Sequence, residues 1–332
     1  MIIRLSLIAL LSIVIHNTSL AQQKVVISSA SMIWDMVDNI AGDKIENRLI
    51  VPIGGDPHTY SPTPKDAQKV ASSDLIFING LTFEGWITEL IENSGTQGKT
   101  ITVTDGLTPI ASSQYKNAYD PHAWMDLNRA QTYISNILQG LIDVDPGNKK
   151  FYEENYKKYA QELKELDAYI SKRILEIPKE KRLIVTSHDA FSYYGQRYGL
   201  NVQGIIGIST ESEAQTSDII RISNSIKSSG VPAIFVESTI NPKLIKQIAT
   251  DNGVAIGGSL YADSIGEKGS SGSTYLQMMK SNTDVIVDAL SGNHNTATAH
   301  TQTGGSGGVK MYLILGGLML LGLIFFITKM NK

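Results

Sequence analysis

The sequence predicts an α/β protein of two lobes, each with a central, mostly parallel sheet flanked by helices. One long rigid helix joins the lobes, and a single transmembrane helix follows at the C-terminus. Short apolar runs alternate with amphipathic helical stretches from residue 24 to residue 290, which is the pattern of parallel strands joined by helices. One helical face continues from Tyr152 to Ile177. An uncharged apolar run, residues 311–328, lies near the C-terminus.

The composition excludes several classes of protein. The chain has 332 residues, of which 42% are hydrophobic, and this share excludes global disorder. A net charge of −3 argues against binding to nucleic acid, which usually requires a basic surplus. The chain contains no cysteine, which excludes disulfides, thiolate metal sites and a lipid anchor attached through cysteine. Any metal site must therefore use His, Asp and Glu.

The N-terminal end is predicted to be a secretory signal peptide, residues 1–21. Arg4 precedes an apolar run, residues 5–15, and Ser19-Leu20-Ala21 forms a small-residue cleavage site. The apolar run is too short to cross a bilayer. The rest of the chain is therefore expected to leave the cytoplasm.

The C-terminal end is predicted to attach the protein to the membrane. Residues 291–308 are mostly small and polar, which predicts a flexible linker. Residues 309–328 predict a transmembrane anchor. Lys329 and Lys332 favour a cytoplasmic tail, residues 329–332. The folded body is thus expected outside the cytoplasmic membrane, held to it by the C-terminal helix.

The first predicted lobe, residues 22–145, contains short apolar runs and amphipathic helices. Pro64 suits the first turn of a helix, because its missing N–H would be unpaired there in any case. Phe83, Trp86, Ile87 and Leu90 line one helical face. The expected strands are 24–28, 47–51 and 75–78, and a helix is expected over 32–41.

The middle of the chain, residues 146–178, predicts a connecting helix. Asp145-Pro146 supplies a cap followed by proline at the first helical position, and Pro178 ends the pattern. A helix of this length spans roughly 45 Å, more than one lobe requires. It is therefore expected to be a rigid connector, with a coiled-coil dimer as the alternative.

The second predicted lobe, residues 179–290, repeats the α/β pattern. The expected strands are 182–186, 233–236 and 253–257, and the expected helices are 190–198, 242–251 and 273–290. Parallel strands with helical crossovers are again predicted.

Three of the six histidines lie in turns between these elements. His58 follows the second strand, His122 precedes a helix, and His188 ends a strand. Ligands bind at the carboxyl ends of strands in open α/β sheets, and neutral imidazole is the commonest metal ligand. Asp-Pro-His occurs twice, and proline restricts the turn before each imidazole. His16 falls in the signal peptide, and His294 and His300 fall in the linker.

A fourth metal ligand is expected in the last strand–helix turn. Asp263 is the preferred candidate, and Glu237, at the end of an earlier strand, is the competitor. Glu237 is also a candidate to orient a ligating imidazole through its other ring nitrogen.

Six segments of the sequence carry a further signal: GGDPHTYSPTPKD (54–66), DLIFINGLTFEGW (74–86), DPHAWMDLNRA (120–130), VTSHDAFSYYGQRYGL (185–200), VESTINPKLIKQIA (236–249) and YADSIGEKG (261–269). They resemble the extracytoplasmic receptors of ABC transporters for zinc and manganese. The resemblance implies two lobes with the metal between them, His58 and His122 as ligands from the first lobe, and His188 and Asp263 from the second. It also implies a permease and its ATPase as partners.

Two features depart from the family pattern. Many zinc-type members carry a His-rich and acidic loop between the first two ligands, whereas residues 105–119 hold no histidine. Members usually attach by lipid or remain free, whereas this chain has a predicted helix anchor.

The predicted function is a receptor, not an enzyme, that binds zinc and delivers it to an ABC transporter permease. Manganese-type relatives tend to have Glu at the third ligand, where this chain has His188, and three imidazoles with one carboxylate suit zinc. A manganese receptor and a metal-dependent surface adhesin are the alternatives. A zinc hydrolase with Glu237 as base is a further one, although four ligands would close the position that catalytic zinc keeps open. Release is expected through local movement of the Asp263 turn.

Overall fold

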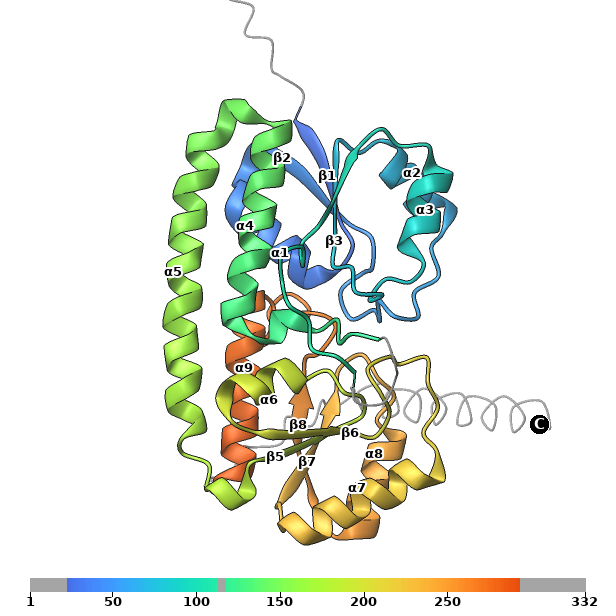
Figure 1. Ribbon diagram of the computed structural model, residues 1–332, viewed down its shortest axis with the longest axis vertical. Coiled ribbons are helices and arrows are strands. Elements are labelled where there is room, and N and C mark those ends of the chain that lie inside the picture. Colours follow the sequence, from blue (N-terminus) through green and yellow to red (C-terminus); the bar gives the residue numbers. More distant parts are fainter. Residues whose placement is uncertain (1–22, 113–117, 293–332) are drawn as a thin grey trace, which may run out of the picture. The chain divides into compact units, whose positions relative to one another are not determined.

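Two groups of parallel strands, with helices around them, make up the folded chain (Figure 1). The computed structural model describes residues 23–112 and 118–292. The predicted signal peptide and transmembrane anchor lie outside these residues, as does nearly all of the predicted linker. Within the described residues, no helix is both long enough and apolar enough to cross a membrane.

The first sheet has four parallel strands in the order β2-β1-β3-β4. The run Leu75-Ile76-Phe77 is buried in β3, as expected for a central parallel strand that is covered on both faces. The strands are β1 (Lys24–Ser28), β2 (Ile45–Leu49), β3 (Leu75–Ile78) and β4 (Lys99–Thr102).

Two of the helices in this first half begin at capping signals of the sequence. Thr63 and Asp66 form a reciprocal capping box around Pro64, and the side chain of Asp126 accepts a hydrogen bond from Asn128 N at the start of α4. The helices are α1 (Ser31–Ala41), α2 (Pro64–Ala71), α3 (Ile87–Ser94) and α4 (Leu127–Val144).

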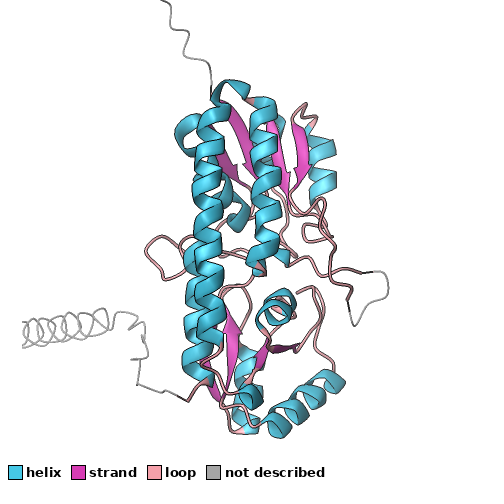
Figure 2. Ribbon diagram, turned by 60° about the vertical axis from the view of Figure 1, so that its left-hand side comes forward, coloured by secondary structure: helices cyan, strands magenta, loops and turns pink. Residues whose placement is uncertain are grey.

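Helix α5, Lys149–Ile174, extends past both groups of strands (Figures 1 and 2). Its 26 residues span roughly 39 Å. The helix is shorter than the stretch 146–178, because Pro146–Asn148 form a separate 3-10 turn and the chain turns again before Pro178. Its apolar face packs against α1, α4 and α9 of the same chain, which argues against the coiled-coil alternative.

The second group of strands consists of two parallel pairs, β5-β6 and β7-β8, with β5 packed beside β7. The strands are β5 (Leu183–Thr186), β6 (Asn201–Gly204), β7 (Ala233–Glu237) and β8 (Ala255–Leu260). The surrounding helices are α6 (Ser192–Tyr198), α7 (Thr216–Ser229), α8 (Lys243–Asn252) and α9 (Tyr275–Leu290). The α/β class with parallel sheets flanked by helices is therefore confirmed.

Candidate metal site

Four side chains from separate turns of the chain meet at one place, and three of these turns follow strands. His58, His122, His188 and Asp263 each offer a ligand atom, and these atoms all lie within 4.8 Å of one another. His58 comes from the loop after β2, His188 from the turn after β5, and Asp263 from the turn after β8, while His122 precedes the 3-10 turn Ala123–Met125 that leads into α4. The two groups of strands therefore direct these turns toward a common point.

The imidazole of His122 is at the centre of the cluster. Its Nε2 lies 3.3 Å from Nε2 of His58 and 3.3 Å from Nε2 of His188. The Asp263 carboxylate lies across from these rings, with Oδ1 3.3 Å from Nε2 of His122 and Oδ2 3.3 Å from Nε2 of His188. Three nitrogens and a carboxylate thus converge at short range.

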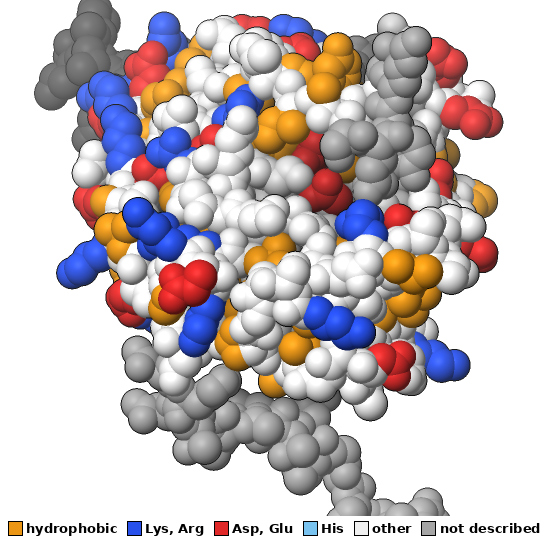
Figure 3. Space-filling view, turned by 60° about the horizontal axis from the view of Figure 1, so that its bottom comes forward, with side chains coloured by type: hydrophobic (Ala, Val, Ile, Leu, Met, Phe, Trp, Pro, Cys, Tyr) orange, Lys and Arg blue, Asp and Glu red, His pale blue; other side chains and the backbone are white. Residues whose placement is uncertain are grey.

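The cluster is closed to solvent. The exposed fraction is 0% for His122, His188 and Asp263 and 6% for His58. No histidine is visible on the end of the molecule shown in Figure 3, where acidic and basic side chains are mixed. An ion can therefore enter or leave only if part of the surrounding structure moves.

The two Asp-Pro-His sequences form the same local turn. Asp56 Oδ1 accepts a hydrogen bond of 2.9 Å from His58 N, and Asp120 Oδ1 accepts one of 2.9 Å from His122 N. Their further contacts differ. Asp120 Oδ1 also lies 2.7 Å from His122 Nδ1, whereas Asp56 Oδ2 accepts a hydrogen bond of 2.6 Å from the Thr210 hydroxyl. Sequence reasoning missed the role of Asp120, although the repeated motif could have indicated it.

Glu237 lies behind His188 and outside the four-residue cluster. Its Oε1 accepts a hydrogen bond of 2.9 Å from His188 N, and its Oε2 lies 2.5 Å from His188 Nδ1. Asp120 and Glu237 therefore occupy equivalent positions behind two imidazoles. A carboxylate there holds the proton on Nδ1 and directs the lone pair of Nε2 into the cluster.

Burial and charge set the protonation of the cluster. Burial lowers the pKa of His58 to about 3. Burial also opposes a charge on His122, but the carboxylates of Asp120 and Asp263 raise its pKa to about 9. Glu237 and Asp263 likewise hold the pKa of His188 well above its usual range, against the effect of burial. The three carboxylates therefore favour positive charge in the cluster, and a bound cation can replace the protons that they hold on His122 and His188.

Two aromatic rings form an apolar wall beside the imidazoles. The Phe83 ring lies 4.8 Å from that of His58, and the Trp124 ring lies 5.2 Å from that of His122, measured between centroids. Phe83 follows a strained turn, since Leu81 and Thr82 have φ of 53° and 64°. Glu84 steadies this turn by accepting hydrogen bonds from the backbone N–H of Asn79 and Gly80. The wall keeps water from this side of the cluster.

Replacing Gly204 with alanine is expected to destabilise the turn that carries His188. A Cβ at Gly204 would lie 2.5 Å from Asp189 N and 2.6 Å from His188 C, so the backbone would have to shift. We expect a loss of about 1–3 kcal/mol in the free energy of unfolding, measured by chemical denaturation. Gly147→Ala is the matched control, since its Cβ would meet only a side-chain atom 3.8 Å away. Equal stability of the two variants would contradict the close packing.

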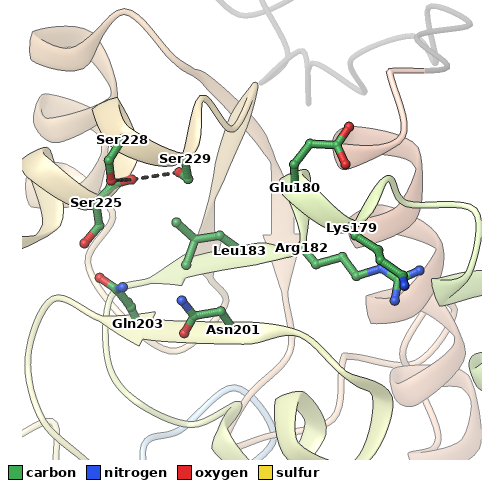
Figure 4. A pocket seen from close by; sticks show the side chains of 9 residues that line it. All are labelled: Lys179, Glu180, Arg182, Leu183, Asn201, Gln203, Ser225, Ser228 and Ser229. Atoms are coloured by element: carbon green, nitrogen blue, oxygen red, sulfur yellow. Dashed lines mark hydrogen bonds between the residues drawn. The ribbon is translucent and has the colours of Figure 1, made fainter.

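A second cavity lies at the other end of β5. It has a volume of about 220 Å³ and adjoins Leu183 and Asn201, the first residues of β5 and β6, whereas His188 follows the last residue of β5. In Figure 4 the serines of α7 face Asn201 and Gln203 across it, while the charged ends of Lys179 and Arg182 point away. This cavity is therefore separate from the histidine cluster.

Comparison with known proteins identifies the relatives of this chain. The family model "ZnuA: Zinc-uptake complex component A periplasmic" matches residues 26–289. The chain belongs to this family. A relative named manganese ABC transporter substrate-binding lipoprotein PsaA, from Streptococcus anginosus, is 39% identical over 81% of this chain and 90% of its own length. Members are receptors for metal transport, so the chain is a metal-binding component of an ABC transporter outside the cytoplasm, and the hydrolase alternative is wrong.

Two solved structures of periplasmic metal-binding proteins share the fold. The periplasmic zinc binding protein TroA of Treponema pallidum has a TM-score of 0.77 at 32% identity, covering 81% of this chain and 99% of that one. A manganese-bound periplasmic metal binding protein from Candidatus Liberibacter asiaticus has a TM-score of 0.74 at 35% identity, covering 81% and 100%. The fold therefore occurs with both zinc and manganese among these proteins.

Proposed function

We propose that this receptor binds Zn²⁺ through His58, His122, His188 and Asp263 and passes it to the permease of its ABC transporter. The observation that carries the proposal is the donor set, three imidazoles and one carboxylate within 4.8 Å. Zinc is usually bound by four ligands, among which imidazole nitrogen is common. The Irving–Williams order gives zinc a higher affinity than manganese for such a set of donors. In this proposal residues 22–145 and 179–290 act as two lobes, with residues 146–178 between them.

The spacing of the donors supports a small, four-coordinate ion. Three donor atoms lie 3.3 Å from His122 Nε2, which is the edge length of a small tetrahedron, and the remaining pairs of donor atoms lie within 4.8 Å of each other. The centre of such a tetrahedron is about 2.0 Å from each corner, which is the usual Zn–N distance. The apolar wall of Phe83 and Trp124 further disfavours the water ligands that a six-coordinate ion requires.

Manganese is the second candidate. The Streptococcus anginosus relative is named for manganese, and Asp263 can offer both oxygens, since each lies 3.3 Å from a different imidazole. With both oxygens of Asp263 bound, the ion would have five donor atoms. The larger share of oxygen donors would favour manganese. Metal availability can also override intrinsic affinity.

The proposal includes the attachment of the receptor to the membrane. Residues 309–328 lie outside the described part of the chain, and we assign to them the role of membrane anchor. The uncharged run 311–328 supports this. The chain has no cysteine, the residue that carries lipid in lipoproteins, whereas the Streptococcus anginosus relative is named a lipoprotein.

Metal content and growth together test which metal the receptor serves. We expect the protein purified from its own organism, grown with both metals, to carry about one zinc per chain. We expect a deletion strain to grow poorly only when zinc is limiting, and added zinc to restore its growth. Manganese in the purified protein, with a defect only under manganese limitation, would establish the second candidate instead. A protein that carries neither metal, in a strain without either defect, would refute both.

A further inference from the structure

We infer that Ser264 and Ser31 form a hydroxyl latch that holds Asp263 against the three imidazoles and sets the rate at which the metal dissociates. This inference rests on the proposed function, since it concerns the same site. Neither serine touches the imidazoles. Both therefore act as positioning residues through Asp263.

Asp263 differs from the three histidines in how it is held. Each of the three histidines donates its backbone N–H to a carboxylate, which is that of Asp56, Asp120 or Glu237. The two oxygens of Asp263 are fully buried, and the polar partners given for them among the described residues are His122 and His188, inside the cluster itself. The position of this carboxylate therefore depends on the backbone of its turn, residues 261–265.

The start of this turn is fixed to α9. Tyr261 N donates a hydrogen bond of 2.9 Å to Asn282 Oδ1, and Asn282 Nδ2 donates one of 2.7 Å to Tyr261 O. Tyr261 is therefore held to the second group of strands and its helices. Ser264 and Ile265, later in the turn, form hydrogen bonds with the first half of the chain instead.

The end of the turn is bound to the first half of the chain through two hydroxyl groups. Ser264 Oγ accepts a hydrogen bond of 2.8 Å from Gly54 N and lies 3.0 Å from Ser31 Oγ. Ile265 N donates a hydrogen bond of 3.0 Å to Ser31 Oγ. Ser31 begins α1, and Gly54 lies in the loop that leads to His58. The latch thus joins the Asp263 turn to the loop of the first histidine.

The protons of the two hydroxyls can be assigned. Ser264 Oγ donates its only proton to Ile265 O at 2.9 Å, so Ser31 must donate in the contact between the two hydroxyls. Ser264 Oγ then accepts from Ser31 and from Gly54, and Ser31 Oγ accepts from Ile265. Ser264 Oγ thus donates one hydrogen bond and accepts two, while Ser31 Oγ donates one and accepts one. Both residues are buried, with exposed fractions of 2% for Ser31 and 1% for Ser264. A buried network of this kind is stronger than its separate bonds.

The burial of the site explains why such a latch would control the metal. Some ligand must withdraw before an ion can leave. Asp263 and His58 both lack a carboxylate behind the group that faces the metal, but only the turn of Asp263 is bound to the other half of the chain through Ser31 and Ser264. When the latch opens, the turn keeps the bonds of Tyr261 to α9 and of Ala262 O to Trp124 Nε1, and it loses its connection to Ser31 and Gly54. Asp263 can then move away from His122, which is supported by Asp120.

The test compares the zinc dissociation rate of the full chain in Ser264→Ala, Ser31→Ala and the double variant. The rate is measured by stopped flow, with a coloured chelator that traps released zinc. We expect each single variant to release zinc roughly tenfold faster, the effect of losing one buried hydrogen bond. The association rate should change little, and the double variant should match the single variants, because the bonds form one network.

Two controls separate the latch from other causes. Ser271→Ala removes an exposed hydroxyl later in the same connection and should leave the rate unchanged. The visible spectrum of the cobalt-loaded variants should match that of the parent, since all four ligands remain. If Ser264→Ala does not fold, Ser31→Ala alone decides the question. Unchanged dissociation in a variant that binds cobalt normally would overturn the latch and leave the proposed function intact. A parent protein that binds neither metal would overturn the proposed function itself.

Discussion

Replacing His58 with alanine is expected to lower the zinc affinity by more than about 100-fold, since removing even an indirect partner of a ligand costs about 10–100-fold. The variant should remain folded. Among residues 23–112 and 118–292, no carboxylate hydrogen-bonds to the His58 ring, and burial keeps this imidazole neutral by lowering its pKa to about 3. Its loss therefore leaves no buried charge behind. The affinity is measured by competitive titration against a zinc chelator, and stability by thermal unfolding.

Two further variants sharpen this result. Thr59→Ala changes an exposed residue of the same loop and should bind zinc like the parent. His188→Ala should lose both zinc affinity and stability, because it leaves Glu237 buried without its partner, and breaking such a pair costs about 3–5 kcal/mol. Parental zinc affinity in His58→Ala would show that the cluster is not the metal site.

Replacing Glu237 with glutamine is expected to reduce the zinc affinity by about 10–100-fold, although Glu237 does not contact the metal. The amide can keep the hydrogen bond from His188 N only through its carbonyl oxygen. Its NH₂ group then faces His188 Nδ1 and donates to it, which places the imidazole proton on Nε2, the atom that must be free to bind metal. The measurement is again a competitive zinc titration.

The control for this second variant is Glu267→Gln, which removes the same charge at an exposed position just beyond the Asp263 turn. It should bind zinc like the parent. A fall in affinity in Glu267→Gln similar to that in Glu237→Gln would indicate that net charge, and not the tautomer of His188, controls binding. No fall in Glu237→Gln would contradict the orienting role of this carboxylate.

Buried strands and the turns after them could be predicted from the sequence. The strands 24–28 and 75–78 are confirmed with the same bounds, because each is an apolar run with clear ends. The strand expected at 47–51 instead begins at Ile45 and ends at Leu49. The four metal-ligand candidates could also be predicted from their places in the chain. Three lie in turns that follow strands and one lies in a turn before a helix, and ligands of open α/β sheets bind near the carboxyl ends of strands. They are His58, His122, His188 and Asp263.

The elements that the sequence did not reveal lack such a signal. Strands β4 and β6 lie at the edges of their sheets, are four residues long and are partly exposed, so they show little hydrophobic pattern. Helix α7 was also not predicted, and only Ile222 and Ile226 of its residues are buried. The contact between Ser31 and Ser264 joins residues 233 positions apart, which no local pattern can indicate.

The ligand atoms come from turns spread over the chain from residue 58 to residue 263, and this separation has a consequence for loading. No short fragment of the chain contains the site, and the unfolded chain offers only isolated imidazoles and carboxylates, which bind metal weakly. A chain that folds only after leaving the cytoplasm cannot acquire its ion from the cytoplasmic pool. The compartment in which the chain completes folding therefore determines which ions are available to compete for the site. Differences in affinity act only among those ions.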